Sequence, residues 1–334
     1  MREVTAVHDP ELEARVVSRA PLLYADGADE ALDRPAHVRA GSGVSWIGGV
    51  LAVVQDDASF VALVDPDTLR VRSVVLPAGE GGRRQFDDGR GNKRWKLDLE
   101  ACVAVPGAEG EILLAWGSGS TPLRERVVVL DGWERGAPRA AVRDASALYA
   151  RLRALTEFSG SDMNVEGAAL VDGRVRLFNR GNGAPRGALL PVDATCDLEL
   201  DALLAYLRDP AGAPPPEPRD VVRYRIGELG GLPLGFTDAV AQGRRVLFTA
   251  AAEDSPDATR DGVVTGSAVG VIDAAGGARW TLLRDAAGRP YPDKVEGIAL
   301  RPGEPGRAWA VVDLDAPELP SELLEVELAG PWGW

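Results

Sequence analysis

The chain has 334 residues, of which 45% are hydrophobic, and it carries 39 glycines, 24 prolines and a formal net charge of −14. This hydrophobic content excludes a disordered chain, and the acidic balance argues against nucleic-acid binding, which needs clustered Lys and Arg. No run approaches the roughly 20 apolar residues of a membrane span, and the N-terminal residues lack the apolar core of a secretory signal. Cys102 and Cys196 have no metal-binding spacing, which predicts reduced thiols in a cytoplasmic protein.

One unit recurs along the chain: a hairpin of two apolar strands around a Gly turn, with further strands after it. The five hairpins are predicted, in chain order, over residues 42–54, 100–116, 166–178, 238–248 and 296–312. A third strand is predicted after each hairpin, at 60–64, 127–130, 188–192, 268–272 and 323–328. A fourth strand is predicted in three of the units, at 71–75, 221–226 and 280–283. Repeats of about 55 to 70 residues with four strands each are typical of β-propeller blades.

The last unit lacks a fourth strand, and residues 14–20 near the start of the chain can supply it. Such closure would pair both open sheet edges. We therefore predict an all-β chain that forms one propeller domain over residues 1–334. Five blades are visible in the sequence, and a sixth with a weaker pattern is possible. The alternative fold is a β-sandwich. Residues 197–208 predict an amphipathic helix, and with the Pro-rich loop that follows they read as an insertion at about 197–218.

Strand direction predicts one crowded end of the ring. If the first strand of each blade descends, the loops after second strands and the linkers after fourth strands emerge where first strands begin. Four of the five first strands begin near an acid, namely Glu100, Glu166, Asp238 and Glu296, whereas the first unit has Ser42. We expect these acids at one channel mouth, with a gap at Ser42 beside His37 and Asp57.

Converging carboxylates repel one another unless they are protonated, paired with a base or bound to a cation. Oxygen ligands favour a hard cation, and loops suit Ca²⁺ better than Mg²⁺. We expect a divalent cation held by Glu100, Glu166, Asp238 and Glu296, with Asn164 adding an amide oxygen. The alternative is that each acid binds backbone N–H groups of the neighbouring blade and has a structural role.

Basic and hydroxyl side chains fall on the same segments and are candidates for binding a small-molecule substrate. They are Arg39, Lys93, Lys96, Ser118, Ser120, Arg180, Asn182 and Lys294. The bases could instead pair with the acids in a structural network. His37, Asp57 and Asp98 are candidates for a general base, and the Gly/Ser run at 117–121 is a weak phosphate-loop signal that a tight turn explains equally well.

Several strings at these positions carry a family resemblance, among them Asn164-Val-Glu-Gly167, Phe178-Asn-Arg-Gly-Asn-Gly183 and Lys294-Val-Glu-Gly297. From about residue 35 to 312 the chain resembles a bacterial propeller family of unknown function. More distantly, the Glu-Gly strand starts are similar to esterase-like phytase and to the gluconolactonase and regucalcin group. The latter resemblance implies a divalent cation at one mouth of a six-bladed ring, held by Glu, Asn and Asp.

The leading hypothesis from these residues is a metal-dependent hydrolase of an ester, lactone or phosphoester at the channel mouth. The alternative is a non-catalytic propeller that binds a small ligand, with a structural charge network. A glycosidase is a third reading, since paired carboxylates serve that chemistry too. Oligomeric state does not follow from these residues.

Overall fold

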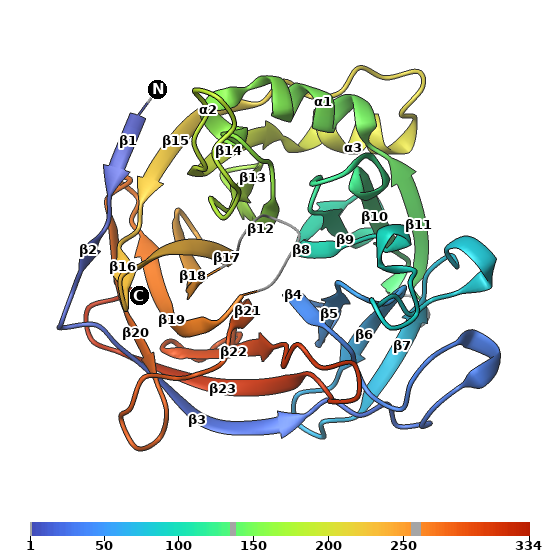
Figure 1. The fold of residues 1–334 in the computed structure, drawn as a ribbon, viewed down its shortest axis with the longest axis horizontal. Coiled ribbons are helices and arrows are strands. Elements are labelled where there is room, and N and C mark those ends of the chain that lie inside the picture. Colours follow the sequence, from blue (N-terminus) through green and yellow to red (C-terminus); the bar gives the residue numbers. More distant parts are fainter. Residues whose placement is uncertain (1, 134–137, 255–261) are drawn as a thin grey trace.

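The computed structural model describes residues 2–133, 138–254 and 262–334. Their strands form blades of four antiparallel strands set around an axis, and the last two blades are joined into one larger sheet (Figure 1). Blade 1 contains β4 (Gly41–Ile47), β5 (Val50–Gln55), β6 (Phe60–Val64) and β7 (Val71–Val75). Blade 2 contains β8 (Leu99–Gly107), β9 (Gly110–Gly117), β10 (Arg126–Asp131) and β11 (Arg139–Asp144). Blade 3 contains β12 (Val165–Val171), β13 (Arg174–Asn179), β14 (Asp193–Glu199) and β15 (Arg219–Arg225).

Blade 4 contains β17 (Leu232–Gln242), β18 (Arg245–Glu253), β19 (Val264–Ile272) and β20 (Ala278–Arg284). Blade 5 contains β21 (Val295–Leu300), β22 (Arg307–Val312), β23 (Glu322–Ala329) and the N-terminal β3 (Glu13–Pro21). Three short strands extend these sheets: β1 (Arg2–Thr5) beside β15, β2 (Val7–His8) beside β20, and β16 (Glu228–Leu229) beside β17. The fold is a β-propeller, as predicted.

The innermost strands contact one another in a closed cycle, β4 to β8, β12, β17, β21 and back to β4. The described part of the chain therefore contains five blades around the axis. β3 pairs with β23 in antiparallel register from Glu13↔Ala329 to Pro21↔Glu322. The strand predicted at 14–20 thus completes the last sheet, and the edge of β23 is paired rather than open.

Apolar side chains from facing sheets fill the space between neighbouring blades. Between blades 2 and 3 this core also takes in three helices, α1 (Ser146–Ala154), α2 (Thr156–Ser159) and α3 (Leu200–Arg208). Tyr149 and Tyr206 on these helices are fully buried against the sheets. Short 3-10 turns lie in the connections, at Glu30–Leu32, Glu80–Gly82, Lys93–Trp95 and Pro122–Arg124. None of the described helices has the length and apolar character that crossing a membrane requires.

Two predicted elements differ in blade 3. The third strand is β14 at Asp193–Glu199 rather than residues 188–192, and the helix begins at Leu200 rather than at 197. Residues 193–199 alternate in strand fashion: Cys196 and Leu198 enter the core, while Asp197 pairs with Arg176 at 2.7 Å from the neighbouring strand. Pairing with β13 therefore places residues 193–199 in a strand, although the spacing of their apolar side chains also suits a helical turn.

Candidate functional site

Each innermost strand has an irregularity in its pairing near the same end of the ring. The skipped position between two paired residues is Glu100 in β8, Glu166 in β12 and Glu296 in β21. In β4 the skipped pair includes Ser42, and in β17 the skipped residue is Thr237. A bulge turns the extra side chain out of the ladder, so these five positions form the rim of the inner ring.

The repeat pattern predicted that Asp238 is equivalent to the three glutamates, but Asp238 lies one residue after the skipped position of its strand. It is fully buried and its Oδ2 accepts the backbone N–H of Ile298 in blade 5 at 2.9 Å. Thr237 occupies the rim position instead, and its hydroxyl donates to Val295 O at 2.7 Å. Asp238 matches the interpretation of an acid that ties neighbouring blades together, and it does not line the cavity at the mouth.

The equivalent position in three other blades is glycine, because the inner strands approach backbone to backbone there. A Cβ on Gly43 would lie 2.8 Å from Glu100 O in the next blade, and one on Gly167 would lie 3.1 Å from Ala239 N. Gly297 faces Ser42 O and Val44 N in the same way. The axis is thus packed immediately below the rim.

Above the rim lies a cavity of about 390 Å³ lined by ten acidic and six basic side chains. Twelve of the predicted site residues line it: Arg39, Asp57, Lys93, Lys96, Asp98, Glu100, Asn164, Glu166, Arg180, Asn182, Lys294 and Glu296. Interblade linkers and second-strand exits supply most of the remaining lining, which confirms the predicted sharing of one mouth.

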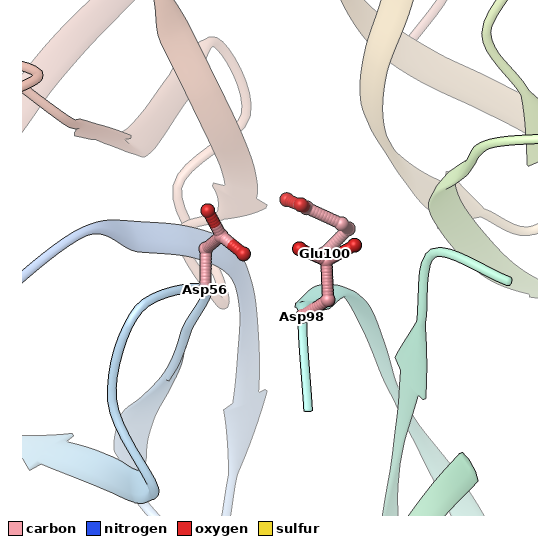
Figure 2. Close-up of side chains that lie close together, drawn as sticks. All are labelled: Asp56, Asp98 and Glu100. Carbon is pink, nitrogen blue, oxygen red and sulfur yellow. The ribbon is translucent and has the colours of Figure 1, made fainter. Parts of the chain in front are cut away.

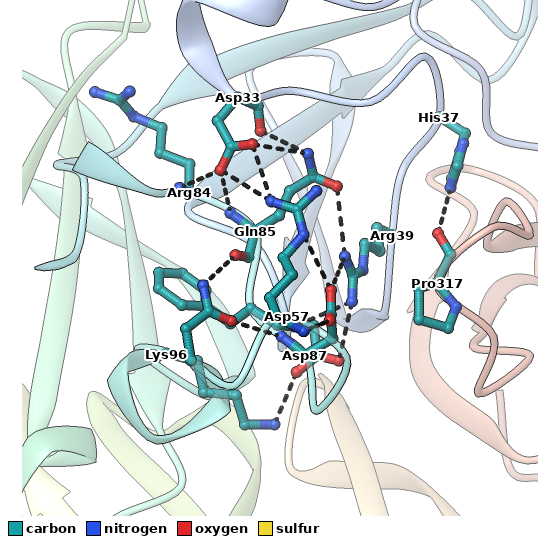
Figure 3. Close-up of polar contacts among 12 residues, drawn as sticks. Asp33, His37, Arg39, Asp57, Arg84, Gln85, Asp87, Lys96 and Pro317 are labelled. Carbon is teal, nitrogen blue, oxygen red and sulfur yellow. Dashed lines mark hydrogen bonds and ion pairs between the residues drawn. The ribbon is translucent and has the colours of Figure 1, made fainter. Parts of the chain in front are cut away.

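Lys96 is the centre of the charge cluster on the blade 1 and blade 2 side. Its buried Nζ lies 2.6 Å from Asp56, 2.8 Å from Asp98 and 3.1 Å from Asp57. Arg124 contacts the second oxygen of Asp98 at 2.9 Å. Beside this cluster, Arg39 pairs with Asp87 at 3.0 Å and with Asp57 at 3.7 Å (Figure 3).

Glu100 adjoins this cluster and brings three carboxylates together. Asp56, Asp98 and Glu100 each offer an oxygen within 4.8 Å of the others, and Figure 2 shows the three side chains converging from two blades. It is the one such group found in the part of the chain that the structure describes. Ser42 Oγ donates to Glu100 Oε2 at 2.6 Å, so the gap in the acid ring is filled by a hydroxyl that orients the neighbouring acid.

A second charge cluster lies on the blade 3 to blade 5 side. The side chain of Glu253, at the end of β18, is 2% exposed and pairs with Arg180 at 2.7 Å and with Lys294 at 3.4 Å. Arg180 also reaches Glu166 at 3.4 Å, and Lys294 reaches Glu296 at 2.7 Å. Asn164 Nδ2 donates to Glu166 at 2.6 Å. Glu253 thus contacts both cations that pair with the rim glutamates.

Burial and neighbouring acids shift the protonation of the cavity carboxylates. Burial raises the pKa of Asp56 and of Glu100 well above the ordinary range, and neighbouring acids add to this effect. Burial raises the pKa of Glu296 to about 8 and, with Asp315 beside it, that of Asp313 to about 7. Although Asp98 is buried, the charges of Lys96 and Arg124 lower its pKa. The ten acids of the mouth outnumber its six bases, and the raised pKa values show that the excess carboxyl groups are costly to ionise without a further cation.

Four predicted site residues lie outside the cavity lining. His37 turns to Pro317 O, 3.1 Å from its Nε2, and Figure 3 shows it apart from the Lys96 cluster. Ser118 donates to Asp98 from below, and Ser120 contacts Ser118 and Arg124. Asp238 is the fourth, at the axis. The Gly/Ser run thus supports Asp98 and Arg124.

The main site residues that the sequence prediction omitted are Asp56, Arg124 and Glu253. Asp56 and Glu253 lie on second-strand exits that strand direction already assigns to the mouth, so that rule applied to every polar exit residue would have found them. Arg124 is the last residue of a 3-10 turn, and its side chain donates to Asp98. Only the folded loop brings that pair together.

A wider groove of about 990 Å³ runs along the facing edges of blades 3 and 4, away from the mouth. Its arginines are engaged within it: Arg176 pairs with Asp197 at 2.7 Å and Arg244 with Asp172 at 3.0 Å. Arg2 donates to Gly276 O at 2.8 Å. Five acids and four arginines line this groove, so its charges are nearly balanced, whereas ten acids and six bases line the mouth.

Comparison with known proteins places the chain by sequence. The model described as "Family of unknown function (DUF6929)" matches residues 37–328. The chain belongs to this family. No curated protein matches it.

Solved structures resemble the chain in fold. A GH43 β-1,3-galactosidase matches with a TM-score of 0.51 and 11% identity over 92% of this chain, which spans 58% of that structure. The calcium-binding protein regucalcin from Agrobacterium tumefaciens matches with a TM-score of 0.41 and 12% identity over 99% of this chain and 98% of its own. The PQQ domain of pyranose dehydrogenase from Coprinopsis cinerea matches with a TM-score of 0.41 and 10% identity, over 97% of this chain and 100% of its own. At these identities the likeness concerns the fold alone.

Proposed function

We propose that this chain is a divalent-cation-dependent hydrolase of a neutral ester or lactone, with its reaction centre at the channel mouth. The observation that carries the proposal is the group formed by Asp56, Asp98 and Glu100, whose oxygens lie within 4.8 Å of one another. All its donors are carboxylate oxygens, the ligands that Ca²⁺ prefers. Asp56 Oδ1 is buried and has no hydrogen-bond partner among the described residues, as expected of a ligand atom.

Charge balance supports a divalent ion. The cluster around Lys96 contains four carboxylates and two cations, namely Asp56, Asp57, Asp98, Glu100, Lys96 and Arg124. Arg39 and Asp87 offset each other at 3.0 Å. Two negative charges remain, so the cluster either takes up protons or binds a doubly charged cation.

Asp56, Asp98 and Glu100 would hold the cation, which would polarise a substrate carbonyl or activate a water molecule. Ser42 holds Glu100 in place through its 2.6 Å hydrogen bond. We assign Asp57 as the proton acceptor because its side chain is 19% exposed at the cavity, whereas that of Asp98 is 3% exposed. His37 is engaged with Pro317 and does not line the cavity.

The lining favours an ester or lactone over a phosphoester. Arg39, Lys96 and Arg124 are ion-paired with carboxylates, and so are Arg180 and Lys294 on the other side. A phosphate would have to displace these acids and would meet ten lining carboxylates. A neutral substrate avoids this repulsion.

The test is calcium titration of chelator-treated protein by calorimetry, with hydrolysis of neutral esters and lactones measured in parallel. We expect Ca²⁺ to bind and to raise the melting temperature, and Glu100→Gln to weaken binding at least tenfold and to abolish hydrolysis. Glu13→Gln, on an exposed face of β3, is the matched control and should change neither.

Equal melting temperatures with chelator and with Ca²⁺, and no heat of binding, would overturn the cation-dependent form. Binding of small ligands without turnover in any variant would favour the non-catalytic propeller instead. In that case the charge network of the mouth is structural.

A further inference from the structure

The ammonium group of Lys96 lies among the carboxylates that would hold the divalent cation. Its buried Nζ is 2.6 Å from Asp56 Oδ2, 2.8 Å from Asp98 Oδ1 and 3.1 Å from Asp57 Oδ1. A lysine ammonium has three N–H donors, so each donor can meet one of these acids. The chain thus supplies both the carboxylates of the site and a cation that pairs with two of them, Asp56 and Asp98.

Both oxygens of Asp98 already face a positive charge. Oδ1 contacts Lys96, and Oδ2 contacts Arg124 Nη1 at 2.9 Å and accepts from Ser118. A calcium ion about 2.4 Å from Oδ1 would lie at most about 5.2 Å from Lys96 Nζ, because that oxygen is itself 2.8 Å from Nζ. Two like charges at this distance repel strongly at a buried site. Lys96 in its present position therefore opposes the binding of a divalent ion.

Of the two bases on Asp98, Lys96 is the one that can move away more easily. Arg124 Nη1 donates to Asp98 at 2.9 Å and to Ser120 Oγ at 2.8 Å, so its planar guanidinium is fixed from two sides. Lys96 has a compact charge on a flexible four-carbon stem, and it lines the cavity of about 390 Å³ at the mouth. This cavity offers space into which its ammonium group can turn.

We propose that Lys96 competes with the divalent cation for Asp56 and Asp98, and that the ion gains these ligands as the Lys96 ammonium turns away into the cavity. This proposal rests on the proposed function for the position of the cation site. The affinity of a calcium site depends on the charge that its ligands present. Lys96 thus lowers the affinity of the site and makes its occupancy depend on the calcium concentration.

The first test is calcium titration of chelator-treated wild type and variants by calorimetry. We expect Lys96→Met to bind Ca²⁺ at least tenfold more tightly than wild type. Lys96→Arg keeps the positive charge and should not bind more tightly than wild type. Lys294→Met is the matched control, because it removes the same charge from the same cavity but from the acids Glu253 and Glu296, and it should tighten binding less than threefold.

The second test uses wild-type protein and does not depend on the folding of a variant. Acetic anhydride acetylates accessible lysine amines, and peptide mass spectrometry measures the reaction at each lysine. The side chain of Lys96 is 5% exposed. We expect saturating Ca²⁺ to raise the acetylation rate of Lys96 at least threefold, whereas that of Lys294, with a side chain 9% exposed, should stay unchanged.

The outcomes separate this proposal from the proposed function. Calcium binding to wild type with no gain in Lys96→Met would overturn the competition and leave the proposed function standing. A gain in Lys96→Met without any calcium effect on Lys96 acetylation would overturn the movement of the side chain. Binding by Lys96→Met but not by wild type would support the competition and overturn the calcium-dependent function. Absence of binding to either protein would overturn both.

Discussion

In the middle of β17, Asp238 occupies the position that glycine holds in three other blades. The repeat pattern in the sequence grouped it with Glu100, Glu166 and Glu296, because in each of these four units an acid precedes a small residue. A bulge inserts one residue, and Thr237 rather than Asp238 is the inserted residue in blade 4. Three of the four ring acids were therefore predictable from the repeat, whereas the position of the bulge depends on pairing between strands.

We predict that Asp238→Ala destabilises the protein by about 2 to 4 kcal/mol, because the Ile298 N–H at 2.9 Å loses its acceptor and a void forms at the axis. Asp238→Asn keeps an acceptor and should cost less than about 1 kcal/mol near pH 7. Burial raises the pKa of Asp238, so ionisation at high pH weakens the wild-type protein but not the Asn variant.

Urea unfolding at pH 6 and pH 9 checks this pair of variants. The stability of Asp238→Asn relative to wild type should improve as the pH rises. An Asn variant as unstable as the Ala variant at both pH values would show that the acid has a different role.

At the scale of elements, the alternating direction of the strands gave the most useful prediction. It predicted from hairpin order alone that linkers and second-strand exits share a mouth, and twelve predicted site residues do line one cavity. Blade 3 shows where prediction from local sequence patterns fails. β14 and α3 divide one segment, and the spacing of its apolar residues suits both a strand and a helix. The contact of Arg124 with Asp98 spans a loop and has no local signal.

β3 provides an element-scale prediction with an internal control. Val16 is 6% exposed and packs into the core of blade 5, whereas its neighbour Val17 is 38% exposed. Val16→Ser should reduce the free energy of unfolding by about 1 to 3 kcal/mol, and Val17→Ser should change it by less than about 0.5 kcal/mol. Chemical denaturation measures both, and equal effects would argue against this register of β3 on β23.

For the whole molecule, the buried carboxylates predict an acidic optimum of stability. Burial raises the pKa of Asp193 to about 6, of Asp313 to about 7 and of Glu296 to about 8. Because these values exceed those of the unfolded chain, the folded state binds more protons than the unfolded state between about pH 4 and 8. The stabilisation is complete below the unfolded values and is lost as the pH rises through the folded values.

We therefore expect the free energy of unfolding to fall by a few kcal/mol from pH 5 to pH 8, on the order set by such shifts. Glu296→Gln should flatten the decline, because it removes the group with the highest of these three pKa values. Urea midpoints measured at half-unit steps of pH check the curve, and stability that rises towards pH 8 would contradict it.

The close approach of the inner strands at Gly43, Gly167 and Gly297 has a kinetic consequence. With these inner strands packed backbone against backbone, and with Asp238 hydrogen-bonded to Ile298 of the next blade, the described residues close the floor of the mouth at the axis. We therefore expect a ligand to enter and leave on the loop side of the mouth. If the proposed hydrolysis takes place there, the departing product shares this path with the incoming substrate.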